Sequence, residues 1–365
     1  MNMQNLNKYF KNKSVLVTGH TGFKGSWLSI WLTYLGAKVI GISNEVLTKP
    51  SNFEIVKLKK KINHNIVDIR NHKKFHNIIK KHKPDFIFHL AAQSLVKKSY
   101  LKPKYTFETN AIGTLNLLES LKITNIKKTC SVVIITSDKS YKNLELDRGY
   151  KENDILGGYD PYSASKACAE LIIQSYLKSF IKSKKNIRIS VARAGNVIGG
   201  GDWSDNRLIP DCIKSIKDKK KLILRFPNST RPWQHVLEAL YGYLILAVKQ
   251  KNNSKLNGSV FNFGPNDKSS ITVLDLVKKI KIRLSDLNWK IIRPKKEIYE
   301  SKLLKLNSKK AQNILKWKCL LNANQTLELV TSWYKYYYKN KKPDMYLYST
   351  HQIKKYENIL KNKTK

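Results

Sequence analysis

Short apolar runs rich in β-branched residues alternate with stretches of helical spacing through the first half of the chain. Residues 14–18 and 38–42 are typical of buried strands, and residues 26–35 between them repeat apolar positions every three or four residues. A strand, a helix and a second strand in this order predict a βαβ unit with parallel strands. Further strands are predicted at residues 86–90, 132–136 and 187–192, and further helices at residues 111–121 and 163–180.

The pattern changes after Arg193, where glycine-rich turns and shorter periodic segments begin. Residues 261–264 again have the pattern of a strand. We therefore predict an α/β protein with a doubly wound parallel sheet of Rossmann type, six or seven strands wide, and a smaller C-terminal lobe. The predicted domains are residues 1–193, to which residues 232–264 return, and a mixed α/β lobe at residues 194–365. We expect the Lys- and Asn-rich last dozen residues to be frayed.

The chain of 365 residues carries a formal net charge of +43, from 69 Lys and Arg against 26 Asp and Glu. Such an excess of cations is common in proteins that bind nucleic acids. Only nine of the 69 are arginine, however, and the lysines are spread along the chain rather than gathered in one segment. Because readers of bases and phosphates favour arginine for its bidentate fork, we interpret the lysines as solvated surface and expect no nucleic-acid partner.

The cysteines, Cys130, Cys168, Cys212 and Cys319, form no CxxC pair, so neither a zinc site nor a disulfide framework is predicted and no metal is expected. The N-terminal segment lacks the apolar core of a signal peptide, and the longest apolar run, residues 239–248, is too short to cross a bilayer. We expect a cytoplasmic protein without a membrane partner.

Three glycines follow the first predicted strand at a regular spacing: Gly19, Gly22 and Gly25. In a dinucleotide-binding turn the first allows the sharp bend, the second lets the backbone approach the pyrophosphate, and the third packs the helix against the strand. The helix N-terminus adds a positive field for the phosphates. Placed between a predicted strand and a predicted helix, the triplet indicates a dinucleotide site. The expected contacts come from Gly19, Thr21, Gly22, Phe23 and Gly25.

The acid that usually binds the adenosine ribose is missing from the end of the second strand, where Ser43 and Asn44 stand. These side chains can hydrogen-bond a ribose hydroxyl but offer no cation to a 2′-phosphate, so NAD is the predicted cofactor rather than NADP. Other strand ends supply the remaining contacts. The expected set is Ser43, Asp68, Ile69, Ala91 and Ala92.

Tyr162 and Lys166 lie four residues apart near the start of a predicted helix, and therefore on one face of it. The ammonium of Lys166 can stabilise a phenolate and lower the pKa of Tyr162. Such a tyrosine can take the proton of a hydroxyl while hydride leaves the same carbon. Ser137, which ends the preceding strand, supplies a second hydroxyl. The pair is also predicted to contact the cofactor.

In this order, TGxxGxxG, a serine at a strand end and YxxxK resemble the extended short-chain dehydrogenase/reductase family. Longer motifs resemble the nucleotide-sugar 4,6-dehydratases of that family, in particular those that act on CDP-glucose. They are HTGFKGSWL (residues 20–28), TKPSNFE (48–54), Ser137-Asp138-Lys139, GGYDPYSASK (157–166), RAGNVIGGGDW (193–203), RPWQHVL (231–237) and NFGPND (262–267). The motifs span nearly the whole chain.

The resemblance implies a lyase that oxidises carbon 4 of the sugar with NAD, eliminates water across carbons 5 and 6, and returns the hydride to carbon 6. It implies that Asp138, kept protonated, gives a proton to the leaving 6-hydroxyl, and that neutral Lys139 removes the carbon 5 proton. Related thymidine-sugar dehydratases carry Glu at the position of Lys139. The other interpretation of Asp138-Lys139 is a solvated turn.

The resemblance also implies a nucleotide-sugar substrate, a homodimer or higher homo-oligomer, and a role in deoxysugar biosynthesis such as that of lipopolysaccharide O-antigen. The loop at residues 147–152 departs from the family pattern, so no substrate contact is assigned to it. No motif accounts for selection of the cytidine base. Expected substrate contacts are Gln93, Asn110, Asn196, Trp203, Arg207 and Arg231, of which Asn110 could instead hold the backbone and Trp203 could belong to the core.

Two alternatives remain at this point. The first is another nucleotide-sugar enzyme on the same scaffold, either an epimerase, which has no need for Asp138 and Lys139, or a dehydratase for another nucleotide. The second, of a different class, is a Rossmann protein that binds RNA without catalysis, which the net charge of +43 suggests.

Overall fold

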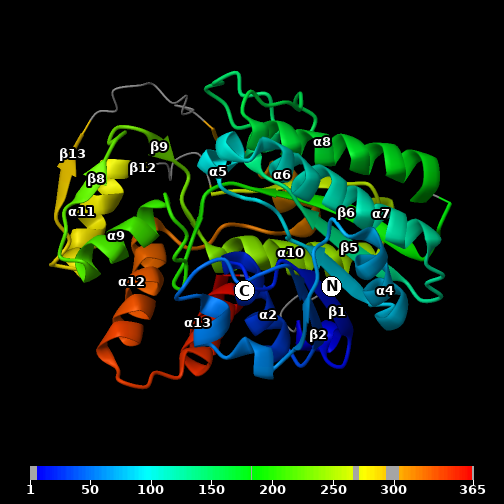
Figure 1. Ribbon diagram of the computed structural model, residues 1–365, viewed down its shortest axis with the longest axis horizontal. Coiled ribbons are helices and arrows are strands. Elements are labelled where there is room, and N and C mark those ends of the chain that lie inside the picture. The colour runs from blue at the N-terminus through cyan, green and yellow to red at the C-terminus, as the bar shows by residue number, and fades with distance from the viewer. Residues whose placement is uncertain (1–5, 182, 266–270, 293–303, 364–365) are drawn as a thin grey trace.

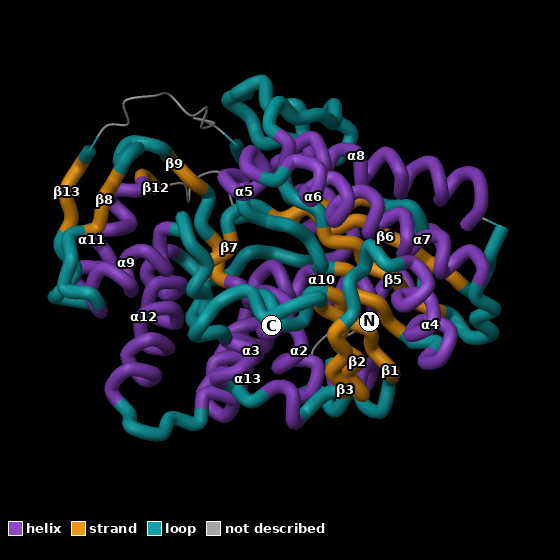
Figure 2. Tube along the Cα trace, in the orientation of Figure 1, coloured by secondary structure: helices purple, strands orange, loops and turns teal. Residues whose placement is uncertain are grey.

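The computed structural model describes residues 6–181, 183–265, 271–292 and 304–363. Seven parallel strands form its central sheet, in the order β11-β6-β5-β4-β1-β2-β3 (Figures 1 and 2). The predicted doubly wound sheet is therefore confirmed. Its strands are β1 (Ser14–Thr18), β2 (Lys38–Ser43), β3 (Asn63–Ile66), β4 (Phe86–His89), β5 (Cys130–Ile135), β6 (Ile187–Ala194) and β11 (Val260–Phe263).

Helices cover both faces of this sheet. The apolar residues of β5 alternate between two cores: Val132 packs in one and Val133 in the other. Because successive strand residues point to opposite faces and both faces are covered, all of β5 is buried and every residue of it but Ser131 is apolar. On the Val132 side lie α4 (His72–His82), α7 (Gly113–Ile123) and α8 (Pro161–Tyr176), and on the Val133 side lie α2 (Phe23–Tyr34), α10 (Val236–Asn252) and α13 (Met345–Lys363).

The long apolar run noted in the sequence forms α10, a helix buried along most of its length against β5 and β6. Gly242 lies where α10 meets β11, and a Cβ at this position would come within 2.4 Å of the Phe263 ring. A helix enclosed on all sides needs no polar face. Within the described residues, no helix is both long and apolar enough to span a membrane.

Part of the rest of the chain forms a smaller group of elements at the left of Figure 1. Two short pairs of strands, β8 with β13 and β9 with β12, pack there beside three helices. Elsewhere β7 pairs with β10, and the short helices α3, α5 and α6 pack against the longer helices α2 and α8. The bounds are β7 (Val197–Ile198), β8 (Leu222–Leu224), β9 (Thr230–Arg231), β10 (Gln234–His235), β12 (Ile271–Thr272), β13 (Trp289–Ile291), α1 (Asn7–Phe10), α3 (Asn52–Ile55), α5 (Val96–Leu101), α6 (Pro103–Phe107), α9 (Leu208–Lys217), α11 (Val273–Arg283) and α12 (Ala323–Lys339).

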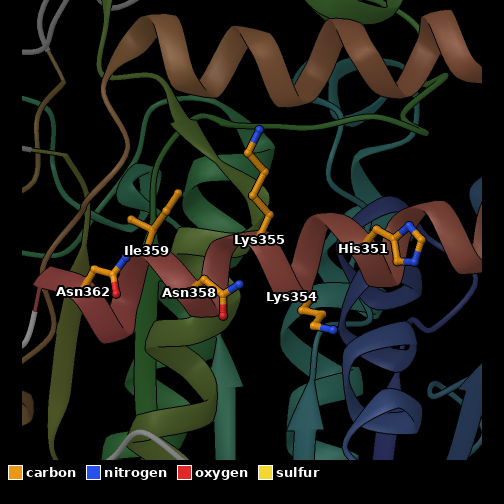
Figure 3. A pocket seen from close by; sticks show the side chains of 6 residues that line it. All are labelled: His351, Lys354, Lys355, Asn358, Ile359 and Asn362. Carbon is orange, nitrogen blue, oxygen red and sulfur yellow. The ribbon is translucent and has the colours of Figure 1, made fainter.

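The predicted boundaries, residues 1–193 and 194–365, stay a prediction, although β11 does return to the sheet. Residues 266 and 267 of the NFGPND motif lie outside the described residues. The prediction of a frayed C-terminus is wrong for residues 354–363, which continue α13. Tyr356 and Glu357 on this helix bond to Glu238 and Trp31, and these contacts fix the helix against the protein. The outer face of α13 lines a shallow cavity of about 430 Å³ (Figure 3).

The order of the strands reverses at β1. The chain adds β2 and β3 on one side of β1 and then places β4 on the other side. The loops that leave the carboxyl ends of β1 and β4 consequently diverge, and the crevice between them is where doubly wound sheets bind their ligands.

Candidate active site

The glycine turn after β1 has the geometry that a dinucleotide requires. Gly19 has a φ of +74°, and a Cβ on it would lie 2.8 Å from the backbone nitrogen of Ala91. A Cβ on Gly25 would lie 2.0 Å from the Gly19 carbonyl oxygen. Neither position therefore accepts a side chain. A Cβ on Gly22, the N-cap of α2, would meet only the Gly19 carbonyl oxygen, at 3.4 Å, so the residues present fit a pyrophosphate at this helix N-terminus.

Ser43 lies at the end of β2, where the ribose-binding acid usually stands. Its hydroxyl accepts a hydrogen bond from the Thr21 backbone at 3.3 Å and pairs with Nδ1 of His20 at 3.1 Å. Nε2 of His20 lies 2.6 Å from Nδ1 of His64. Burial lowers the pKa of His20 to about 4, with backbone contact raising it and His64 lowering it further. This hydrogen-bonded chain was not predicted, because its members come from three separate strand ends.

Asp68, beyond β3, is bound by Arg70. The arginine backbone donates to Oδ1 at 2.9 Å, and Nη2 donates to Oδ2 at 2.7 Å. Desolvation raises the pKa of Asp68, but the hydrogen bonds and charge of Arg70 outweigh it, so the net pKa is lowered. Ile69 is buried against Gly113. The cofactor contact expected from Asp68 stays a prediction, with Arg70 as a neighbour that the sequence did not single out.

Ser137 and Asp138 form a compact unit beyond β5. Ser137 is the N-cap of a short 3₁₀ helix (Asp138–Ser140), and its hydroxyl donates to Oδ1 of Asp138 at 2.8 Å. The Lys139 backbone donates to the same carboxylate oxygen at 2.9 Å. Asp138 is only 6% exposed, and burial raises its pKa despite these bonds and the charges of Lys139 and Lys24. A raised pKa is what a proton donor requires, because the carboxyl then keeps its proton. The burial of Asp138 does not fit the interpretation of this segment as a solvated turn.

Tyr162 and Lys166 project from the first turns of α8, which packs directly against this 3₁₀ helix. The turn is set by Pro161 at the first helical position and by Asp160, whose side chain caps the Ser163 backbone at 3.0 Å. Both functional side chains are buried. The YxxxK spacing thus brings the phenol and the amine to the carboxyl end of β5, beside Ser137.

The pKa of Tyr162 is raised to about 12, not lowered as the spacing predicted. Burial is the largest cause, and a hydrogen bond with Ser137 opposes it. The pKa of Lys166 is itself lowered to about 8, by burial and then by the charge of Lys24, while Glu170 raises it. The prediction is wrong in sign because it counted the attraction between the two groups and neglected the desolvation of both.

Lys24 is a charged neighbour of the candidate site that the sequence did not single out. It lies on the first turn of α2, half-buried, within the electrostatic reach of Asp138, Lys166 and Arg207. Its pKa is lowered to about 8, chiefly by burial and next by Arg207. The signal was present, since a lysine between Gly22 and Gly25 faces the phosphate-binding turn.

Several expected substrate contacts already bond within the protein. The Gln93 amide bonds to Leu95 and Thr106, and the Asn110 amide bonds to the Gln93 backbone and the Ser165 hydroxyl. These side chains hold the loop after β4 against α8. Trp203 is buried in an aromatic cluster around Trp333, as the alternative interpretation of it proposed.

The other three expected contacts are half-buried. Arg207 is within 3.8 Å of Asp202, and its charge acts on both Tyr162 and Lys24. Asn196 follows β6, and its carbonyl accepts from the Gln234 backbone. Arg231 lies on β9, where Nη1 donates to the Thr230 carbonyl at 2.9 Å. The loop at residues 147–152, which differs from the family pattern, is anchored at Tyr150. The backbone of this residue forms hydrogen bonds with the backbones of residues 305 and 307.

The described residues contain no cluster of three or more His, Cys, Asp or Glu side chains that could hold a metal ion. The sequence pattern of the GDP-mannose 4,6 dehydratase family matches residues 16–330. The chain belongs to this family. Its members include the nucleotide-sugar dehydratases of the short-chain dehydrogenase/reductase type that the motifs predicted, and the family prediction is confirmed.

A CDP-glucose 4,6-dehydratase from Salmonella typhimurium is 43% identical over 354 residues, which cover 95% of this chain and 97% of the relative. Solved structures share the fold. A UDP-glucose 4-epimerase from Thermotoga maritima, determined with UDP-glucose, has a TM-score of 0.76 at 23% identity, covering 88% of this chain and 98% of its own. A dTDP-glucose 4,6-dehydratase from Streptomyces venezuelae, determined with NAD, has a TM-score of 0.76 at 21% identity, covering 88% and 97%.

Proposed function

We propose that this protein is an NAD-dependent hydro-lyase that converts CDP-glucose to CDP-4-keto-6-deoxyglucose and water. The observation that carries the proposal is the buried Asp138 carboxyl, held by Ser137 beside Tyr162 and Lys166. An epimerase needs an acid/base only at the oxidised carbon, whereas elimination needs a further proton donor. The choice of CDP is supported by the 43% identical relative and by the Ser-Asp-Lys motif.

The glycine turn and the N-terminus of α2 would hold the pyrophosphate of NAD, and Lys166 would hold the nicotinamide ribose. When bound, NAD accepts the hydride of carbon 4 and later returns it to carbon 6. Tyr162, hydrogen-bonded to Ser137, takes the proton of the 4-hydroxyl as that hydride leaves. Oxidation of carbon 4 to a ketone acidifies the proton on carbon 5.

Elimination then uses the two residues beyond Ser137. The Lys139 amine takes the proton of carbon 5, and Asp138 gives its proton to the 6-hydroxyl, which leaves as water. After hydride has returned to carbon 6, the Lys139 ammonium gives a proton back to carbon 5. The proton that Tyr162 took then restores Asp138 through the Ser137 hydroxyl, which bonds to both groups, so that only water is lost. Arg231 and Arg207 suit the diphosphate, because a guanidinium binds phosphate oxygens in pairs, and Asn196 suits the sugar.

We infer a homodimer or higher homo-oligomer in the cytoplasm, with a place in deoxysugar synthesis such as that of O-antigen. The inference is supported by adjoining helices that expose apolar side chains: Leu171 on α8 is 55% exposed, and Ile123 at the end of α7 is 53% exposed. Light scattering on the purified protein tests the oligomer.

The function is tested by incubating the purified protein with CDP-, UDP-, dTDP- and GDP-glucose. The alkali-induced absorbance of 4-keto-6-deoxy sugars reports dehydration. We expect product from CDP-glucose at a rate well above that from the other three. Turnover of another nucleotide sugar and none of CDP-glucose would overturn the substrate, and interconversion of 4-epimers without this absorbance would overturn the reaction type.

A further inference from the structure

A cavity of about 680 Å³ lies at the edge of the sheet opposite the catalytic cluster. It is bounded by the end of α8 with the π-helical turn that follows (Leu177–Ile181), the start of β6, and the turn after α10. Figure 1 shows the end of α8, from which the chain returns into β6. Because β6 rises about 3.3 Å per residue, its two ends are about 20 Å apart. The cavity is therefore separate from the active site.

Four cationic side chains line the cavity: Lys178, Lys184, Lys185 and Arg188. Its remaining lining residues are neutral, and no salt bridge joins these four to an acid within the described part of the chain. Like charges gathered in one concave space repel one another and concentrate counterions. The cavity thus offers a positive field for a multivalent anion, and none of its lining residues is a carboxylate that would neutralise this field.

Two polar groups in the cavity are fixed in place. Nη1 of Arg188 donates to the carbonyls of Gln250 and Lys251 at 2.9 and 2.7 Å, which anchors the guanidinium to the end of α10. The Asn257 side chain accepts from the Ile189 backbone at 2.9 Å through Oδ1, so its NH₂ group remains as a donor. Preorganised donors lose little conformational entropy when an anion binds to them.

We propose that this cavity binds an anion that carries two or more adjacent phosphate groups, such as a nucleoside di- or triphosphate. The volume lies within the range of small-molecule sites. Three lysines and an arginine match the charge of a diphosphate or triphosphate, and a single phosphate would leave most of them unpaired. The site does not depend on the proposed function.

The test uses inorganic pyrophosphate as the probe, in calorimetric titration of the full-length protein with NAD bound. Two sites are expected in the wild type, one at the active site and one in the cavity. Lys184→Glu with Lys185→Glu should raise the Kd of one site at least about tenfold, while Arg231→Ala should weaken the other site. CDP-glucose turnover should be unchanged in the double lysine variant, because neither residue lies in the catalytic machinery.

The matched control is Lys73→Glu with Lys74→Glu on the exposed side of α4, which makes the same change in net charge. It should retain both sites. An equal loss of binding in the control would show general surface electrostatics and overturn the proposal. Retention of both sites by the Lys184/Lys185 variant would also overturn it. Lower thermal stability of that variant without pyrophosphate, together with unchanged pyrophosphate binding, would instead mean that these lysines only complement the carbonyl end of the helix.

Discussion

Arg193 and Glu170 form an ion pair in which both side chains are 1% exposed. Nε of Arg193 donates to Oε1 of Glu170 at 2.7 Å, and the Thr136 hydroxyl donates to the same oxygen. Glu170 lies one turn beyond Lys166 on α8, and Arg193 lies near the end of β6. The pair therefore joins the helix that carries Tyr162 and Lys166 to the sheet.

Glu170→Ala should lower the free energy of unfolding by about 3–5 kcal/mol, because it leaves the Arg193 guanidinium buried without its partner. Urea denaturation followed by circular dichroism measures the change. Asp205→Ala is the control, since Asp205 pairs with Lys214 at the surface and should cost at most about 1 kcal/mol. If both substitutions lowered the free energy of unfolding equally, the buried pair would contribute no more to stability than a surface pair.

Tyr162→Phe should abolish oxidation of carbon 4 while NAD affinity stays within a few-fold of the wild type, because only the acid/base hydroxyl is lost. Turnover and NAD titration by fluorescence check the two parts. Phe keeps the buried ring in place, so the fold should be unaffected. Full activity in this variant would exclude Tyr162 from the mechanism.

Asp138→Asn and Lys139→Ala should separate oxidation from dehydration. Each removes a proton transfer worth roughly 10²–10⁴-fold in rate at the elimination step and leaves Tyr162 intact. Reduced cofactor should then accumulate when CDP-glucose is added, which stopped-flow absorbance detects, whereas the wild type should show little. Dehydration at the wild-type rate, with normal solvent deuterium incorporation at carbon 5, would contradict the assigned roles.

Lys24→Met should shift the pH profile of kcat/KM to higher pH. The positive charge of Lys24 lowers the pKa of both Lys166 and Asp138, so its removal raises both values. Lys24→Arg keeps the charge and should leave the profile near that of the wild type. Glu170→Gln should move the Lys166 limb the other way, because the carboxylate raises that pKa. Unshifted profiles in both Lys24→Met and Glu170→Gln would show that Lys166 does not control the rate.

Glu238 on α10 makes stability depend on pH. Burial raises its pKa to about 7, although the Leu321 backbone, the Tyr356 hydroxyl and the Leu320 backbone bond to the carboxyl and lower it. The folded state therefore holds a proton that the unfolded state loses near its ordinary pKa of about 4.3, so this group destabilises the fold as pH rises from about 4.3 to 7.

Glu238→Gln keeps an acceptor for the two backbone donors and removes the charge. The Tm of the variant minus that of the wild type should become more positive between pH 5 and pH 8. Differential scanning calorimetry across this range measures it. A difference that stays constant with pH would mean that Glu238 is already ionised in the folded protein at pH 5.

The sheet could be predicted because buried parallel strands are continuous apolar runs, and the glycine turn, Ser137 and the YxxxK pair follow such runs directly. Local spacing also placed Tyr162 and Lys166 on one face of a helix. Sequence spacing carries no information about desolvation, which decided the pKa of Tyr162. It also could not reveal that the Gln93 amide bonds to Thr106 and the Asn110 amide to Ser165, since these partners lie on other elements.

The connections from His20 to His64 and from Glu170 to Arg193 were beyond prediction for a related reason. Each joins residues that are distant in sequence and meet only because the fold brings their elements side by side. Only Glu170 could have been noticed in the sequence, because it lies four residues after Lys166 and therefore on the same face of the helix. The frayed terminus was a wrong prediction, since a Lys- and Asn-rich composition does not reveal that Tyr356 is buried and that it and Glu357 bond to residues of other helices.

The outermost strand of the sheet, β11, comes from residues beyond Arg193, as does α10, which covers β5 and β6. During synthesis, the edge of β6 therefore has no partner strand until the ribosome has released Phe263. The apolar sheet face that α10 covers is likewise exposed until that helix has been made. A fragment ending at residue 193 would contain every proposed acid and base and still expose a template for strand-to-strand association. In the cell, premature termination or slow translation of this stretch would yield aggregates rather than a smaller working enzyme.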